Sequence, residues 1–152
     1  MNRVKGFTLV ELMVTIAIAA ILLGIAIPSF QTVSRNNAVR TTANDLISTI
    51  NIARQQSMSM RSEVEVQPAL GGWGDGWKLV FSDANAGEDA EFSPKRGVSI
   101  NTTSSGLTFL PRGGLENGGG VEFTVAHSET SITSRIFCVS FFGKISTGRC
   151  SR

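Results

Sequence analysis

The spacing of hydrophobic positions changes twice along the chain. From Phe7 to Ile27 the sequence FTLVELMVTIAIAAILLGIAI is almost wholly apolar, and its single charged residue is Glu11. From residue 30 to about 60, apolar residues recur every three or four positions, and after residue 60 they alternate with polar ones. These patterns are typical of a membrane-spanning helix, an amphipathic helix and half-buried β-strands, in that order.

The apolar run is long enough to cross a bilayer. Its 21 residues span about 31 Å as a helix, which matches the hydrocarbon core of a membrane. Arg3 and Lys5 precede it, so we expect the N-terminus to stay in the cytoplasm and the rest of the chain to be exported. The alternative is a secretory signal cleaved near Gly24-Ile25-Ala26. The run exceeds the apolar region of about 7–15 residues found in such signals, which favours a retained anchor.

The second half of the helix is amphipathic. Its apolar stripe consists of Val39, Ala43, Leu46, Ile47, Ile50 and Ala53. A helix with one apolar face needs a partner, and the sequence that follows offers a β-sheet. Pro28 lies between the two halves, so we expect a helix break or bend around residues 24–29. A simple helix end is the alternative.

Short strands separated by glycine follow the helix. We expect strands at residues 62–66, 77–81, 97–101, 107–110, 121–126 and 132–140, with a last short strand starting at 144–145. Glycine-rich segments at 71–76 and 113–120 are expected to connect them. The sequence therefore predicts an α+β fold in which a long N-terminal helix packs on a β-rich antiparallel head.

Glu11 is the unusual residue of the anchor. A carboxylate in the middle of a membrane helix costs on the order of 2.5–3.5 kcal/mol, so such a residue indicates a function. Glu11 is also only the fifth residue of the run, and a carboxylate that reaches the membrane interface is the alternative interpretation.

The N-terminus resembles the class III signal of type IV pilins and pseudopilins. The resemblance rests on Lys5-Gly6 followed by Phe7-Thr8-Leu9-Val10-Glu11. It implies that a membrane prepilin peptidase cuts between Gly6 and Phe7 and methylates the new amine of Phe7, while the helix is retained as an inner-membrane anchor. The expected organisation is leader, anchor, amphipathic helix and head, at residues 1–6, 7–29, 30–60 and 61–152.

Charge burial explains why such a protein needs Glu11. The new amine at Phe7 is a positive charge that enters an apolar filament core, and a buried charge is tolerable when it is paired. A carboxylate from a neighbouring subunit supplies the pair. We therefore expect Phe7 and Glu11 to carry assembly by fixing the axial register of each subunit.

The head resembles the minor pseudopilin GspH and the minor pilins FimT and FimU. The residues that carry this are Leu107 to Gly113 and Phe142-Gly143-Lys144. The resemblance implies a structural subunit with a periplasmic head, whose partners are other minor and major pilins and, before assembly, inner-membrane lipids. The leading hypothesis is a minor pilin of a type IV pilus, acting in priming or in the tip complex. A type II secretion pseudopilin and a DNA-binding pilin for DNA uptake are the alternatives.

The two cysteines, Cys138 and Cys150, are expected to pair. An exported protein with two cysteines at short spacing commonly forms one disulfide. A loop of this size predicts a stabilisation of roughly 3 kcal/mol, and the bond would hold the C-terminal tail to the last long strand. Two free thiols are the alternative.

The C-terminal tail is the candidate DNA site. Loss of the leader leaves twelve basic and twelve acidic residues, so anion binding has to be local, and no acidic residue follows Glu129. Lys144, Arg149 and Arg152 are the candidate phosphate contacts. FimT-like pilins implicated in DNA uptake carry a C-terminal glycine-arginine-x-arginine motif. This chain departs from it, with Gly143-Lys144-Ile145-Ser146 at one place and one residue too many between Arg149 and Arg152. Solvated surface charge is the alternative.

Catalytic and cofactor motifs are absent from the sequence. His127 is the only histidine, and together with two cysteines it does not have zinc-site spacing. The glycines at 71–76 lack the spacing of a phosphate-binding loop. We expect no enzymatic activity, no metal and no cofactor. Trp77 is expected in the core, and Trp73 is equally suited to the core or to a surface contact.

Overall fold

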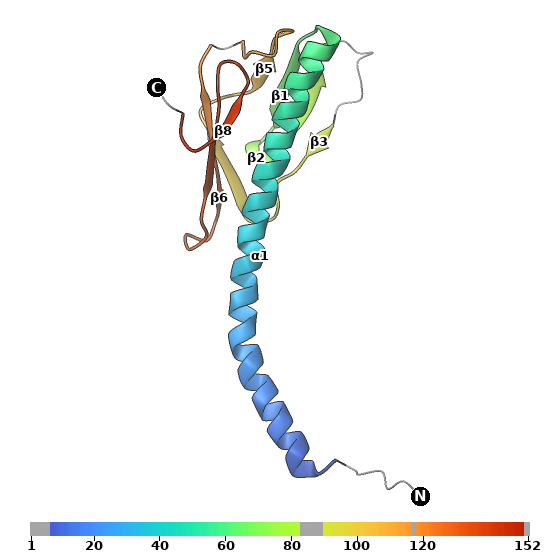
Figure 1. Ribbon diagram of the computed structural model, residues 1–152, viewed down its shortest axis with the longest axis vertical. Helices are drawn as coiled ribbons and strands as arrows, with labels where there is room; N and C mark the ends of the chain where they lie inside the picture. Colours follow the sequence, from blue (N-terminus) through green and yellow to red (C-terminus); the bar gives the residue numbers. More distant parts are fainter. Residues whose placement is uncertain (1–6, 83–89, 117, 151–152) are drawn as a thin grey trace, which may run out of the picture. The chain divides into compact units, whose positions relative to one another are not determined.

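The computed structural model describes residues 7–82, 90–116 and 118–150. In these ranges it contains one α-helix and eight β-strands. The chain divides into two compact units, Met1–Ser34 and Arg35–Arg152. The second unit joins the C-terminal part of the helix to the predicted β-rich head, and it contains every described strand (Figure 1). From here on the whole of this unit is termed the head.

Helix α1 runs from Leu9 to Met60. At its start the hydroxyl of Thr8 accepts a hydrogen bond from the backbone N–H of Glu11 at 3.2 Å, an N-cap in a Thr-x-x-Glu sequence. At its end Arg61 adopts a left-handed conformation with φ of 52°, which is how many helices stop. The prediction of one long helix ending near residue 60 is confirmed.

The helix break expected at Pro28 does not form, while the bend expected around residues 24–29 stays a prediction. Helix α1 is continuous through this residue. Proline removes one backbone donor, and nearby hydroxyls make additional bonds to the backbone. Ser29 Oγ donates to the carbonyl of Ile25 and Thr32 Oγ1 donates to that of Pro28, each at 3.2 Å. Side-chain hydroxyls of this kind allow helices in apolar surroundings to tolerate proline.

The strands form two antiparallel sheets of four. Sheet A has the order β3-β2-β1-β5 and sheet B the order β4-β6-β7-β8. Their bounds are β1 Val64–Ala69, β2 Gly72–Phe81, β3 Glu91–Phe92, β4 Val98–Thr102, β5 Leu107–Phe109, β6 Val121–His127, β7 Arg135–Val139 and β8 Ile145–Thr147. Every pairing between them is antiparallel, as predicted.

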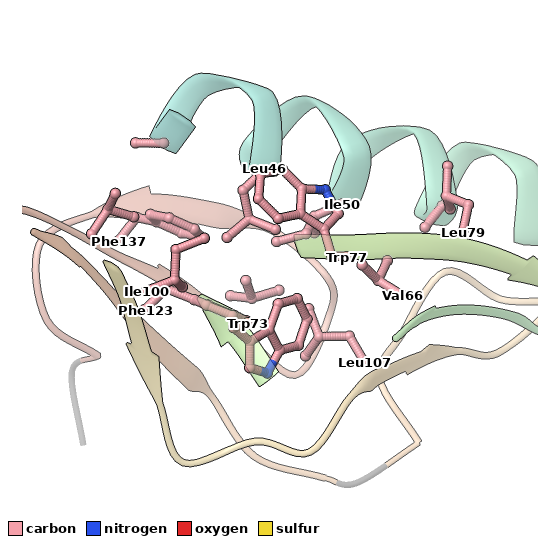
Figure 2. Packing of buried hydrophobic residues seen from close by; sticks show 14 of the residues in the cluster. Leu46, Ile50, Val66, Trp73, Trp77, Leu79, Ile100, Leu107, Phe123 and Phe137 are labelled. Atoms are coloured by element: carbon pink, nitrogen blue, oxygen red, sulfur yellow. The ribbon is translucent and has the colours of Figure 1, made fainter. Parts of the chain in front are cut away.

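The core of the head lies between α1 and the two sheets. Figure 2 shows Leu46 and Ile50 of α1 directed at side chains of the strands, Trp77 among them. The buried helix positions include five of the six residues of the predicted stripe, and the sixth, Ile47, is half-buried. All buried hydrophobic residues of the described chain lie between Val39 and Val139. The head therefore contains its whole core and needs no apolar contact from the anchor to fold.

The first glycine-rich segment differs from the prediction. Strand β2 begins at Gly72, within the segment expected to be a connection, and short β3 was not expected. Gly72 pairs with Ala69 but Trp77 pairs with Pro68, so the register shifts and residues 73–76 bulge. Gly76 has φ of 139°, and a Cβ there would lie 2.5 Å from the carbonyl oxygen of Phe92. Glycine is thus required for β3 to approach β2, a constraint that strand periodicity does not reveal.

Candidate functional site

The N-terminal half of α1 has no protein covering it in the single chain. Each large apolar side chain from Phe7 to Phe30 is more than half exposed. The most apolar stretch of the helix has a mean hydropathy of 2.6, and none of it is buried. By length and composition α1 is able to cross a membrane. Exposed apolar area on this scale indicates a surface that is covered by lipid or by other subunits.

Glu11 lies in the first turn of this helix. The backbone N–H of Glu11 is held by Thr8, and Phe7 precedes the helix with 72% of its surface exposed. A carboxylate in the first turn is favoured by the positive end of the helix dipole. The predicted assembly residues Phe7 and Glu11 therefore lie at the same end of the helix, separated by one turn. Gly6 and the rest of the predicted leader lie outside the described residues.

The structure joins Cys138 of β7 to Cys150, with Cα atoms 5.1 Å apart. The backbone N–H of Cys150 donates to the carboxylate of Glu122 at 3.3 Å. A Cβ at Gly120 would lie 3.1 and 3.4 Å from the two sulfur atoms. The tail after β8 is therefore held against β6 and β7 by a covalent bond and a hydrogen bond.

The two basic residues of the tail that the structure describes lie at opposite ends of strand β8. Lys144 is exposed in the turn between β7 and β8, and Arg149 is exposed after β8. The extended strand β8 separates them, since a strand rises about 3.3 Å per residue. Arg152 lies outside the described residues. The structure thus leaves the DNA site as a hypothesis based on two exposed cations.

The two head motifs meet at one residue of helix α1, Arg54. Arg54 of α1 donates from Nε to the carbonyl of Gly113 at 3.1 Å. Gly113 and Gly143 have φ of 78° and 70°, and a Cβ at Gly143 would lie 2.5 Å from the Gly113 carbonyl oxygen. The N–H of Leu115 donates to the carbonyl of Phe141 at 2.9 Å. Both glycines are therefore needed to pack the two turns against each other and against α1.

The remaining candidates are structural. Trp77 is 1% exposed and donates its indole N–H to Thr49 of α1 at 3.1 Å, as expected of a core residue. Trp73 is also buried, and its indole N–H donates to the carbonyl of Ser104 at 2.8 Å. His127 ends β6, where Nδ1 accepts the N–H of Glu129 at 3.0 Å. Within the described ranges no three histidine, cysteine or acidic residues gather as a metal site would require.

Two family models match the chain. The prokaryotic N-terminal methylation motif matches residues 1–27. The type II transport protein GspH family matches residues 42–143, which is well over half of the chain. The chain belongs to the GspH family. It is therefore a minor pilin or pseudopilin, and the predicted family is confirmed.

Solved structures show the same fold. The type IV minor pilin FimU of Pseudomonas aeruginosa is 20% identical, with a TM-score of 0.63 over 74% of this chain and 90% of that one. A second crystal form of FimU gives 19% identity and a TM-score of 0.60 over 72% and 92%. The minor pseudopilin EpsH of the Vibrio cholerae type 2 secretion system is 9% identical, with a TM-score of 0.56 over 72% and 94%. No curated protein sequence matches the chain.

Family membership accounts for the N-terminal motif and for the exposed apolar half of helix α1. The methylation motif implies processing by a prepilin peptidase and assembly with other pilins. The uncovered apolar half of α1 is then a membrane anchor that passes into a filament. The family consists of structural pilins and pseudopilins.

Proposed function

We propose that the chain is a minor pilin of a type IV pilus that acts in priming or in the tip complex. The observation that carries the proposal is that one helix has both an uncovered apolar surface and a single carboxylate, in its first turn. Such a helix leaves lipid for a filament only if its charges are paired. The amine of Phe7 and the Glu11 carboxylate of adjacent subunits supply that pair.

Processing fits the same scheme. The prepilin peptidase cuts between Gly6 and Phe7 and methylates Phe7, which removes both basic residues of the leader. Before assembly the protein is a single-pass protein of the inner membrane. The head is in the periplasm, where an oxidising environment allows the Cys138–Cys150 disulfide to form.

Replacement of the carboxylate tests this proposal. In Glu11→Ala, the Phe7 amine of the adjacent subunit has no partner in the apolar core, so the protein should stay in the membrane fraction and be lost from sheared filaments. The head should unfold at the same temperature, because it contains its own core. Glu129→Ala, which removes an exposed head carboxylate paired with Arg35 at 3.7 Å, is the matched control. Normal incorporation of Glu11→Ala into filaments would contradict the proposal.

A minor pseudopilin of a type II secretion system is the second candidate. It is favoured by the family model, which describes a type II transport protein. The two candidates differ in partners, so crosslinking of the full chain in its own cells distinguishes them. Recovery of pilus subunits supports the first candidate, and recovery of secretion pseudopilins supports the second.

DNA binding is a further candidate, supported by the exposure of Lys144 and Arg149. A Lys144→Ala/Arg149→Ala/Arg152→Ala head should bind duplex DNA more weakly than the parent head at low salt. Because each neutralised phosphate releases counterions, the parent's affinity should also fall steeply with salt concentration. Absence of binding by the parent head at low salt would remove this candidate.

A further inference from the structure

The loop between β6 and β7, residues 128–134, touches helix α1 at the residue where the head begins. The carboxylate of Glu129 in this loop lies 3.7 Å from the guanidinium of Arg35, and Arg35 is the first residue of the head. Among the residues that the structure describes, this is the only ion pair. The start of the head is therefore connected to the strands through a charge contact that depends on how the loop holds Glu129.

Backbone bonds fix the loop on both sides of Glu129. The N–H of Ser128 donates to the carbonyl of Gly97 at 2.9 Å, and the N–H of Ile132 donates to the carbonyl of Glu129 at 3.1 Å. The Ile132 side chain is buried in the core. The N–H of Glu129 itself bonds to the side chain of His127, so this ring completes the support of the acidic residue.

The bond between Glu129 and His127 requires a neutral imidazole. The N–H of Glu129 donates to Nδ1 of the ring at 3.0 Å. A backbone amide can only donate, so Nδ1 must have a free lone pair while this bond exists. A protonated imidazole carries a hydrogen on both nitrogens and no longer accepts. Protonation therefore breaks the bond and places two N–H groups against each other. The Ser128 hydroxyl, 3.5 Å from Nδ1, is the neutral group that is able to accept from the protonated ring.

The loop, and not the ring, is the part that is free to move. His127 ends β6 and pairs with Val98 of β4, and its side chain is half-buried. A Cβ at Gly97 would lie 2.8 Å from Nε2, so the ring lies directly against the backbone of this residue. The side chain of Glu129 is 52% exposed. The strands therefore keep the ring in place, and a change in its charge acts on the exposed carboxylate.

Glu129 is the only anion available to a charged ring. The segments in contact with His127 and its loop are residues 93–100, 123–135 and, on α1, 35–42. Glu129 is the only acidic residue in these segments. Their basic residues are Arg35, Arg40, Lys95, Arg96 and Arg135. A protonated His127 therefore has one carboxylate to pair with, and that carboxylate is already paired with Arg35.

We propose that protonation of His127 transfers the Glu129 carboxylate from Arg35 to the imidazolium, and so releases this contact with α1 as the pH falls. Histidine is the side chain whose charge ordinarily changes between about pH 5 and 8. A charge-assisted bond from the ring to the carboxylate replaces the lost amide bond, and Arg35 is left to solvent. The start of the head is thus a pH-sensitive contact. The inference does not depend on the role of the chain in a filament.

Nuclear magnetic resonance of the full chain in detergent tests the proposal at the loop. When the pH falls from about 8 to about 5, the amide proton of Glu129 should shift in the same titration step as the His127 ring. The ion pair is measured by a double-mutant cycle of Arg35→Gln and Glu129→Gln, followed by urea unfolding of the head at low salt. Its coupling should change the unfolding equilibrium constant about two- to fivefold at about pH 8 and should vanish at about pH 5.

His127→Asn is the matched control. The Oδ1 atom of asparagine is able to accept the Glu129 N–H and does not titrate. In this variant the Glu129 amide and the coupling between Arg35 and Glu129 should be the same at about pH 8 and at about pH 5. His127→Gln replaces it if near-ultraviolet circular dichroism shows that the head is disturbed.

Four outcomes would overturn the proposal. Two concern the parent chain, namely a ring that stays neutral at about pH 5 and a protonated ring beside an unchanged Glu129 amide. The third is a coupling between Arg35 and Glu129 that has the same size at both pH values. The fourth is a His127→Asn chain with the pH dependence of the parent. The Glu11→Ala experiment reports separately on assembly through the helix.

Discussion

The two halves of α1 have the same backbone and opposite surroundings. Up to Phe30 its large apolar side chains are more than half exposed, while Leu46 and Ile50 of the head have no exposed surface. In the head the sheets of the same chain cover the apolar stripe. In the anchor no part of the described chain covers the apolar side chains, and exposed apolar area on this scale indicates a surface covered by lipid or by other subunits. That a residue is helical therefore does not show whether its side chain stabilises the head. The same substitution in the two halves should change the free energy of unfolding of the head by different amounts.

The largest expected effect separates the halves directly. Leu46→Ala should destabilise the head by about 2–5 kcal/mol, because it leaves a cavity beneath α1. Leu22→Ala in the same helix removes the same atoms from a side chain that is 62% exposed, so the unfolding free energy of the head should change by less than about 0.5 kcal/mol. Thermal unfolding of the full chain in detergent, followed by near-ultraviolet circular dichroism, measures both. Equal losses in the two variants would contradict the independence of the head.

The disulfide should have a somewhat smaller effect, and only on the head. Cys138→Ala/Cys150→Ala opens a loop with a sequence separation of 12, which should cost about 3 kcal/mol. Reduction of the unmodified head by dithiothreitol should lower its unfolding midpoint to a similar value. Membrane association through the anchor should remain unchanged in flotation assays, since both cysteines belong to the head. A reduced head as stable as the oxidised one would show that the bond only tethers the tail.

The smallest effect distinguishes two glycines within the head. Both Gly143 and Gly148 have positive φ, at 70° and 98°, but a Cβ meets the Gly113 carbonyl only at position 143. Gly148→Ala should cost about 1 kcal/mol for the backbone conformation alone. Gly143→Ala should cost about 1–3 kcal/mol more, because the two turns must separate. Urea unfolding of the two variants measures the difference, and equal midpoints would contradict the packing role assigned to Gly143.

Patterns that depend on neighbouring residues were predictable. The apolar run, the buried stripe from Val39 to Ala53 and most strands follow from spacing alone, because each element buries one face at its own period. The signal around Gly6 and Phe7 and the turn motifs were sufficient to identify the family. Pro28 was mistaken for a break because local rules count the missing donor and do not include the hydroxyls of Ser29 and Thr32 that bond the nearby carbonyls.

Contacts between distant residues could not be predicted. The bond between Arg54 and Gly113 joins positions 59 residues apart, a separation that no local pattern spans. Trp73 was ambiguous because the bulge that buries it depends on the pairing of Gly72 with Ala69.

The sequence by itself determined which part of this protein is anchor and which part is head, because hydrophobic period and length are local properties read along one chain. It also determined the family, because the methylation motif and the glycine turns are short and contiguous. Only the tertiary structure decided what the glycine turns do and which surfaces face outward. Those properties depend on backbones that approach within a few ångströms across two sheets and a helix, and no local pattern records that approach.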